Sequence, residues 1–216
     1  TDVRTGEVLA LVTYPSYDNN RLSGTMDTAY YNRLLNDLSN PLYNNATQVV
    51  KAPGSTFKPI TAIAALEEGV GDAGEIITCT GVYEEVATPI RCSVYPGNHG
   101  DETMVEAIQN SCNYYFNEMA HRLSMDEEGN YTPSLGVEKI REYAAKFGLD
   151  SVSGVEIPEV APHMTTEDPE RSAMGQATHA YTNVQLSRYV TAVANQEKRV
   201  PLDWITPDGM QVTDAF

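Results

Sequence analysis

One segment, residues 53 to 69, constrains the fold of this 216-residue chain more than any other. A Pro-Gly pair opens the segment, apolar side chains then recur at helical spacing, and Gly69 stands where helices commonly end. Ser55 and Lys58 lie three residues apart at the start of this predicted helix, so they share one face about one turn apart. The segment therefore predicts a core helix that presents a hydroxyl and an amine side by side.

This spacing has a chemical consequence. A serine hydroxyl needs a base within hydrogen-bond reach to act as a nucleophile near neutral pH. Lys58 can be that base for Ser55 if burial lowers the pKa of its amine, and the helix N-terminus offers N–H groups to an oxyanion. A second motif, Ser111-Cys112-Asn113, would supply another wall of the same site. Ser-x-x-Lys alone also occurs by chance on solvated helices, but the full Ala-Pro-Gly-Ser-Thr-Phe-Lys-Pro string is much rarer.

Size and charge narrow the class of protein. The chain is long enough for one sizeable domain, and its apolar content of 41% is a globular value. The formal net charge of −16 argues against nucleic acid or an anionic membrane surface as a partner, because both bind basic patches. The sequence has no signal peptide and no apolar run of the roughly 18 residues that span a bilayer. It opens abruptly in an expected strand, which indicates a piece of a longer protein.

The remaining elements follow from periodicity and turn residues. We expect a strand over residues 6–14, helices over 26–38, 102–110, 114–123, 136–147 and 182–195, and an irregular stretch with short extended pieces over 70–102. The second motif then falls at the junction of two helices.

Together the two motifs resemble the active-site signature of penicillin-binding proteins and serine β-lactamases. Over residues 3 to 195 the chain resembles the transpeptidase domain of class B penicillin-binding proteins of the elongation or sporulation type. The stretches that carry the similarity besides the motifs are Thr5–Ala10, Pro15–Asp18, Asn40–Thr47, Met174–Gln176, Thr182, Gln185–Leu186 and Ala194–Asn195. The resemblance implies a partial transpeptidase domain over residues 1–195, followed by a tail of uncertain structure over 196–216.

The implied fold is α/β (α+β), the penicillin-binding-protein transpeptidase or serine β-lactamase-like fold. It has an antiparallel sheet flanked by helices and an all-helical lobe that carries the second motif. In this chain the sheet would be incomplete.

The resemblance also implies roles for single residues. Ser55 would be the acylated nucleophile and Lys58 its general base. Ser111 would carry a proton between Lys58 and the leaving amine, and Asn113 would bind the substrate's amide carbonyl. The implied reaction is peptidoglycan D,D-transpeptidation on stem peptides that end in D-Ala-D-Ala, with β-lactams acylating the same serine.

Further expectations come from the same resemblance. The protein would act at the extracytoplasmic face of a bacterial membrane, in cell wall biogenesis, cell shape and antibiotic resistance, with its anchor outside this chain. A membrane-embedded glycosyltransferase would be a partner, through regions outside this chain. Nucleic acid would not be a partner, and the reaction would need no cofactor.

The family's third motif, a Lys-Ser-Gly or Lys-Thr-Gly on an edge strand, is missing. The lysines stand at positions 51, 58, 139, 146 and 198, and none is followed by Ser-Gly or Thr-Gly. This indicates truncation or loss of the last strands, so we expect the chain alone to be weakly active or inactive. A non-catalytic β-lactam sensor or scaffold is the alternative. A serine β-lactamase is less favoured, because no Glu-x-x-Leu-Asn stretch follows the second motif.

The cysteines leave three interpretations open. Cys79 and Cys92 could form a disulfide, as in domains outside the cytoplasm, or stay as buried thiols. With His99 and Asp101 they could instead hold zinc, because thiolate, imidazole and carboxylate are all zinc ligands. The spacing fits no common zinc-finger pattern, but the segment resembles one in class B enzymes that have a zinc site near the active site. Cys112 is expected to be a small buried packing residue.

Overall fold

The computed structural model describes residues 1–195, which divide into two compact units. Unit 1 consists of Thr1–Val50, Val152–Pro162 and the described residues from Tyr181 onward, and unit 2 of Lys51–Ser151 and His163–Ala180. The predicted tail over 196–216 lies outside the described residues. Among the described helices, none combines the length and the apolar character that crossing a bilayer requires.

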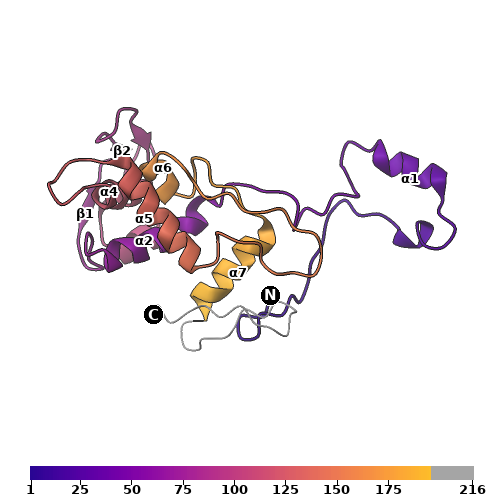
Figure 1. Ribbon diagram of the computed structural model, residues 1–216. Coiled ribbons are helices and arrows are strands. Elements are labelled where there is room, and N and C mark those ends of the chain that lie inside the picture. Colours follow the sequence, from indigo (N-terminus) through magenta and orange to yellow (C-terminus); the bar gives the residue numbers. More distant parts are fainter. Residues whose placement is uncertain (196–216) are drawn as a thin grey trace. The chain divides into compact units, whose positions relative to one another are not determined.

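Unit 2 holds most of the regular structure (Figure 1). Its elements are the 3-10 turn η2 (Gly54–Phe57), α2 (Lys58–Glu67), β1 (Ile77–Cys79), β2 (Val82–Tyr83), β3 (Ile90–Arg91), β4 (Gly100–Glu102), α3 (Met104–Gln109), α4 (Asn113–Leu123), α5 (Pro133–Lys146) and α6 (Pro169–Ala173). Helix α4 is central and packs against α2, α5 and α6. It therefore joins the two segments that carry the sequence motifs.

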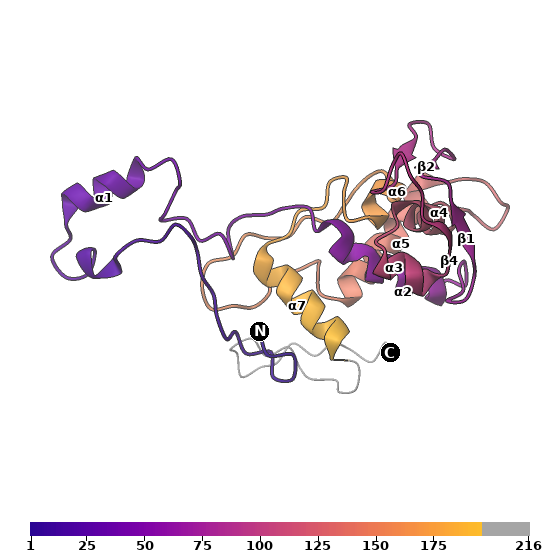
Figure 2. The ribbon, with the colours of Figure 1, turned by 180° about the vertical axis from the view of Figure 1, so that it is seen from behind.

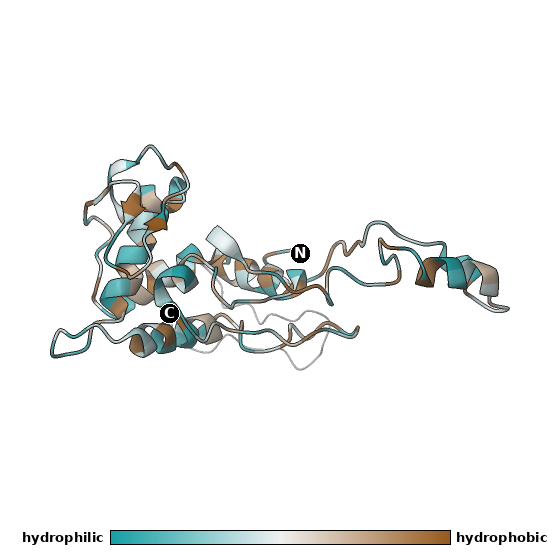
Figure 3. Ribbon diagram, turned by 90° about the horizontal axis from the view of Figure 1, so that it is seen from above, coloured by the Kyte–Doolittle hydropathy of each residue, from teal (hydrophilic) through white to brown (hydrophobic). Residues whose placement is uncertain are grey.

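The core of unit 2 forms where α2, α3 and α4 meet. Ala62 and Ala65 of α2 pack in one buried cluster with Met104, Ala107 and Phe116. Small side chains on α2 let α4 approach closely, so the start of α2 is held against the start of α4. Figure 3 shows hydrophilic and hydrophobic residues on the same helices, as expected for amphipathic helices with one buried face.

Two antiparallel ribbons complete unit 2. Strand β1 pairs with β4 (Figure 2), and β2 pairs with β3. In the first ribbon, side-chain alternation places Cys79 and Glu102 on the buried face. Thr78 and Asp101 lie opposite each other on the exposed face. This register decides which polar side chains of β4 face the interior.

Unit 1 contains η1 (Asn19–Arg21), α1 (Thr28–Leu35) and α7 (Asn183–Ala194). Helix α7 begins with a capping box in which Thr182 and Gln185 satisfy each other's backbone N–H groups. The amide of Gln185 also donates to Glu159 at 2.7 Å and to the Val160 carbonyl at 2.9 Å. The start of α7 therefore organises the loop that precedes it in this unit.

The helices confirm the sequence expectations to within a few residues, but the strand over residues 6–14 was wrong. In the described chain this segment pairs with no strand. Leu9 and Val12 are 69% and 79% exposed, so its apolar pattern has no packed face there. An extended segment becomes a stable strand only where a neighbour satisfies its N–H and C=O groups. The sheet part of the expected fold is thus limited to two short ribbons among the described residues.

Candidate active site

The turn that carries Ser55 is held by a glycine contact. Gly54 has a φ of +59°, and its N–H donates to the carbonyl of Gly175 at 2.9 Å. Gly175 has a φ of +70°, and a Cβ there would lie 2.2 Å from the carbonyl oxygen of Gly54. Gly175 therefore packs directly against the turn that carries Ser55. Pro59 falls within the first turn of α2, where proline is tolerated.

Ser111 occupies a position that usually belongs to glycine. Its N–H donates to the Ile108 carbonyl and the N–H of Cys112 to the Ala107 carbonyl, which is the Schellman pattern at the end of α3. Ser111 has a φ of +57°, a left-handed conformation that costs a non-glycine residue about 1–2 kcal/mol. Glycine would remove this strain but also the hydroxyl that contacts Lys58 and Ser55.

A continuous hydrogen-bonded network joins the two motifs. The Lys58 amine donates to the Ser111 carbonyl at 2.6 Å, to Ser111 Oγ at 3.0 Å and to Asn113 Oδ1 at 2.8 Å. Ser111 Oγ donates to Ser55 Oγ at 2.8 Å. The structure thus brings all four predicted residues together, and the link between Ser55 and Lys58 runs through Ser111. The helical spacing of Ser55 and Lys58 had suggested a direct contact instead.

The environment of Lys58 makes its amine easier to deprotonate than an exposed lysine amine. Its side chain is 1% exposed and lies over the ring of Phe116. Burial lowers the pKa of Lys58 to about 8, against the opposite effect of Cys112, Cys92 and Glu102. Ser55, by contrast, is exposed. The network therefore connects an accessible hydroxyl to a buried base.

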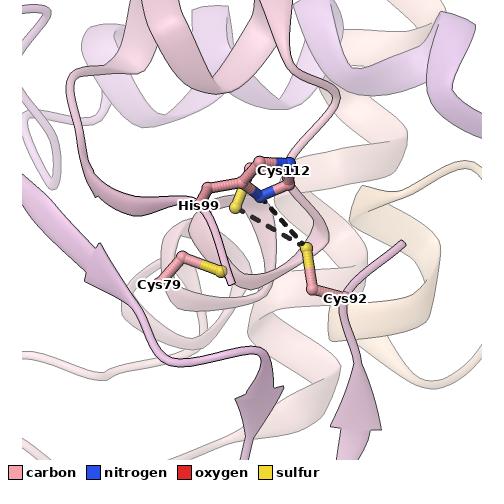
Figure 4. Close-up of side chains that lie close together, drawn as sticks. All are labelled: Cys79, Cys92, His99 and Cys112. Atoms are coloured by element: carbon pink, nitrogen blue, oxygen red, sulfur yellow. Dashed lines mark hydrogen bonds between the residues drawn. The ribbon is translucent and has the colours of Figure 1, made fainter. Parts of the chain in front are cut away.

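A second group of side chains lies directly behind this network. Cys79, Cys92, His99 and Cys112 point toward one another (Figure 4), and their ligand atoms all lie within 4.8 Å of one another. The Cys92 sulfur lies 3.8 Å from the Cys112 sulfur and 3.5 Å from His99 Nδ1. All three thiols are free in this structure. We call these four residues the Cys/His cluster, and its composition could hold a metal ion.

The cluster differs from the predicted ligand set at one position. Asp101 was expected as the fourth ligand, but it lies on the exposed face of β4 and accepts a hydrogen bond from Thr78 at 2.6 Å. Cys112 takes its place. It is buried, as expected of a packing residue, but its thiol faces the other ligands. Strand alternation is the reason, because Asp101 and its buried neighbour Glu102 must point to opposite faces.

The cluster shares atoms with the motif that carries Ser111 and Asn113. The N–H of Asn113, in the first turn of α4, donates to the Cys92 sulfur at 3.3 Å. The Cys112 thiol lowers the pKa of Cys92, and so do the backbone N–H groups of Tyr114, Asn113 and Val94. The same contact with Cys92 raises the pKa of Cys112. Cys92 therefore loses its proton more readily than an ordinary thiol, next to the motif that carries Ser111 and Asn113.

Comparison with known proteins gives consistent results. Residues 1–211 match the family described as penicillin binding protein transpeptidase domain. The peptidoglycan D,D-transpeptidase MrdA of Haemophilus influenzae is 29% identical over 213 residues, which cover 91% of this chain and 31% of that protein. PbpA of Mycobacterium tuberculosis, also named a peptidoglycan D,D-transpeptidase, is 32% identical over 200 residues, covering 89% of this chain and 37% of that protein.

Solved structures agree with this result. Pseudomonas aeruginosa PBP2 in complex with WCK 5153 has a TM-score of 0.78 at 25% identity, covering 90% of this chain and 43% of that chain. The imipenem acyl-enzyme complex of penicillin-binding protein A from M. tuberculosis has a TM-score of 0.74 at 26% identity, covering 89% and 44%. The chain spans about a third of the length of the two curated relatives.

Proposed function

The chain belongs to the penicillin-binding-protein transpeptidase family, and we propose that it is the part of a peptidoglycan D,D-transpeptidase that becomes acylated on Ser55. The observation that carries this proposal is the hydrogen-bonded series from exposed Ser55 through Ser111 to buried Lys58. Two relatives carry the name peptidoglycan D,D-transpeptidase, and one similar structure is an acyl-enzyme.

The network supports a proton relay. When the Lys58 amine is neutral, the hydroxyls rotate and reverse the two hydrogen bonds, so that Ser55 donates to Ser111 Oγ and Ser111 donates to the amine. The Ser55 proton then passes to Ser111 Oγ as the Ser111 proton passes to the amine. The Ser55 oxygen attacks the carbonyl carbon between the two D-alanines of a stem peptide. The C–N bond then breaks, and the proton on Lys58 returns through Ser111 to the departing D-alanine. An amine of a neighbouring stem peptide next attacks the ester carbon, and the C–O bond to Ser55 breaks as the new amide C–N bond forms. The proton that the amine loses passes through Lys58 and Ser111 to the Ser55 oxygen.

Asn113 is suited to hold the substrate. Its Oδ1 accepts from Lys58 at 2.8 Å, which fixes the orientation of the amide. Its Nδ2 donates to the Arg91 carbonyl at 3.4 Å, close to the limit for a hydrogen bond. A substrate carbonyl can replace this long contact by a shorter one. Asn113 would thus align the peptide bond with Ser55.

We extend the proposal to the setting of the reaction. Peptidoglycan strands are cross-linked outside the bacterial cytoplasm, so we propose that the chain acts at the extracytoplasmic face of the membrane. A membrane-embedded glycosyltransferase that supplies new strands is the expected partner. One similar solved structure, 28% identical with a TM-score of 0.78, is that of a peptidoglycan synthase complex that coordinates polymerization and crosslinking.

The test uses the protein in the longest form that its gene encodes. We expect stoichiometric labelling of Ser55 by a fluorescent penicillin and exchange of a D-amino acid into a D-Ala-D-Ala peptide. Ser55→Ala should lose both. Labelling without exchange would favour the sensor or scaffold, and turnover of a chromogenic cephalosporin would favour the β-lactamase. Equal labelling of Ser55→Ala would contradict the proposal.

We also propose that the Cys/His cluster binds a structural zinc ion. Zn–S bonds of about 2.3 Å and Zn–N bonds of about 2.0–2.1 Å imply tetrahedral ligand separations of about 3.8 Å for S–S and about 3.6 Å for S–N. The observed separations around Cys92 are 3.8 Å and 3.5 Å. Bound zinc would cross-link the ribbons to the second motif as a closed structural site.

Metal analysis after dialysis tests the zinc proposal. We expect one zinc ion per chain and three reactive thiols after chelation under denaturing conditions. Cys112→Ser should lower the zinc content, whereas Asp101→Asn should leave it unchanged. Fewer than three thiols would show a disulfide instead, and three thiols without zinc would leave free cysteines as the answer.

A further inference from the structure

Glu102 is a buried acid that the relay does not use. Its side chain is 3% exposed, although it ends the short surface strand β4. A buried carboxylate is costly unless hydrogen bonds or a cation compensate its charge. The surroundings of both oxygens therefore need an explanation.

One oxygen of Glu102 is tied to the loop that carries the second motif. Oε1 accepts a hydrogen bond from Asn110 Nδ2 at 2.7 Å. Asn110 is the C-cap of α3 and immediately precedes strained Ser111. This contact anchors the loop at the residue where its unusual backbone begins.

The other oxygen faces the Cys/His cluster. Oε2 of Glu102 is buried without a hydrogen-bond partner of normal geometry, and it lies 3.7 Å from His99 Nδ1. The Glu102 carboxylate is also close enough to the Cys112 thiol to raise its pKa. A buried oxygen with no donor of normal geometry, beside the His99 imidazole and the Cys112 thiol, is placed to face a cation that these residues help to hold.

We propose that Glu102 is a positioning residue whose carboxylate joins the Cys/His cluster to the catalytic loop, residues 110–113. One oxygen holds the loop through Asn110, and the other faces the metal ligands. Occupancy of the cluster and the position of Ser111 are thereby coupled through a single side chain. The inference rests on the proposed function of both sites.

Two variants separate the two contacts of Glu102. Glu102→Gln keeps an oxygen that can accept from Asn110 but replaces the charge at the cluster. Asn110→Ala keeps the charge but removes the contact with the loop, at an exposed position that should tolerate the change. Asp101→Asn is the matched control, because it neutralises the adjacent acid on the opposite face of the same strand.

Each variant is titrated with cobalt(II), followed by its thiolate charge-transfer and visible bands, and with zinc against a chromophoric chelator. Glu102→Gln should bind metal about 10–100-fold more weakly and show altered cobalt bands. Asn110→Ala should bind metal normally but be acylated on the order of 10-fold more slowly at saturating zinc, because small displacements of reacting groups slow reactions steeply. Asp101→Asn should match the unaltered protein in both measurements.

All variants are made in the longest form that the gene encodes. The unaltered protein of that form is measured first, so that failure of the proposed function can be told from failure of the inference. If it binds no metal or is not acylated, the proposed function fails and the inference fails with it. If it does both, while Glu102→Gln and Asn110→Ala behave like Asp101→Asn, only the inference is overturned. If Glu102→Gln does not fold, normal acylation of Asn110→Ala overturns it as well.

Discussion

Replacing Lys58 by methionine is expected to slow acylation of Ser55 by about 10²–10⁴-fold, the usual contribution of a general base. Methionine has a similar length and suits a buried site, so the change removes the amine with little effect on packing. Ser55 and Ser111 would keep their hydroxyls but lose the final proton acceptor. The second-order rate constant for a fluorescent penicillin measures the effect.

The pH dependence of the unaltered protein gives an independent check. The folded-state pKa of Lys58 is lowered to about 8, so the neutral amine increases as the pH rises through that value. Acylation should therefore accelerate with pH and level off above about 8.

Lys51→Met is the matched control for Lys58→Met, since Lys51 is exposed. A Lys58→Met variant that is acylated at the rate of Lys51→Met would rule out Lys58 as the base.

Gly175→Ala is expected to lower the free energy of unfolding more than Gly69→Ala does, and also to impair acylation. The new Cβ would meet the carbonyl oxygen of Gly54 at 2.2 Å and the Cβ of Phe57 at 2.8 Å. Backbone atoms cannot rotate away, so the turn that carries Ser55 must move. Denaturant unfolding measures the change in the free energy of unfolding, and penicillin labelling measures the displacement of Ser55.

Gly69→Ala separates steric overlap from backbone strain. Gly69 has a φ of +67°, close to that of Gly175, but a Cβ there would meet nothing within 4 Å. Both variants carry the cost of a left-handed alanine, and Gly175→Ala adds overpacking of about 1–3 kcal/mol. We expect only Gly175→Ala to impair acylation. Equal free energies of unfolding for the two variants would contradict the prediction, because they would show that Gly54 can move away from the new Cβ without loss of stability.

The turn that carries Ser55 could be predicted because its determinants are local. Helical spacing places Ser55 and Lys58 on one face, and the capping glycine marks the end of the helix. The contact with Ser111 and Asn113 spans more than 50 residues of sequence, and only the family resemblance indicated it. The relay through Ser111 depends on the left-handed backbone conformation of that residue. The sequence does not reveal this conformation, because serine rarely adopts it.

The cluster was predicted in part for a related reason. Cys79, Cys92 and His99 were recognised by residue type, which needs no tertiary information. The choice between Asp101 and Cys112 depends on the register of β1 against β4, which sets the face of each side chain. The strand over residues 6–14 failed similarly, because an apolar pattern does not reveal whether a partner strand is present.

Peptide mapping by mass spectrometry after reaction with benzylpenicillin tests most directly whether Ser55 is the nucleophile. We predict that the peptide containing Ser55 gains the mass of one intact penicillin, and that the yield of this adduct increases with pH through about 8. An adduct on any other residue, or a Ser55 peptide that stays unmodified while the drug is consumed, would contradict the proposed relay.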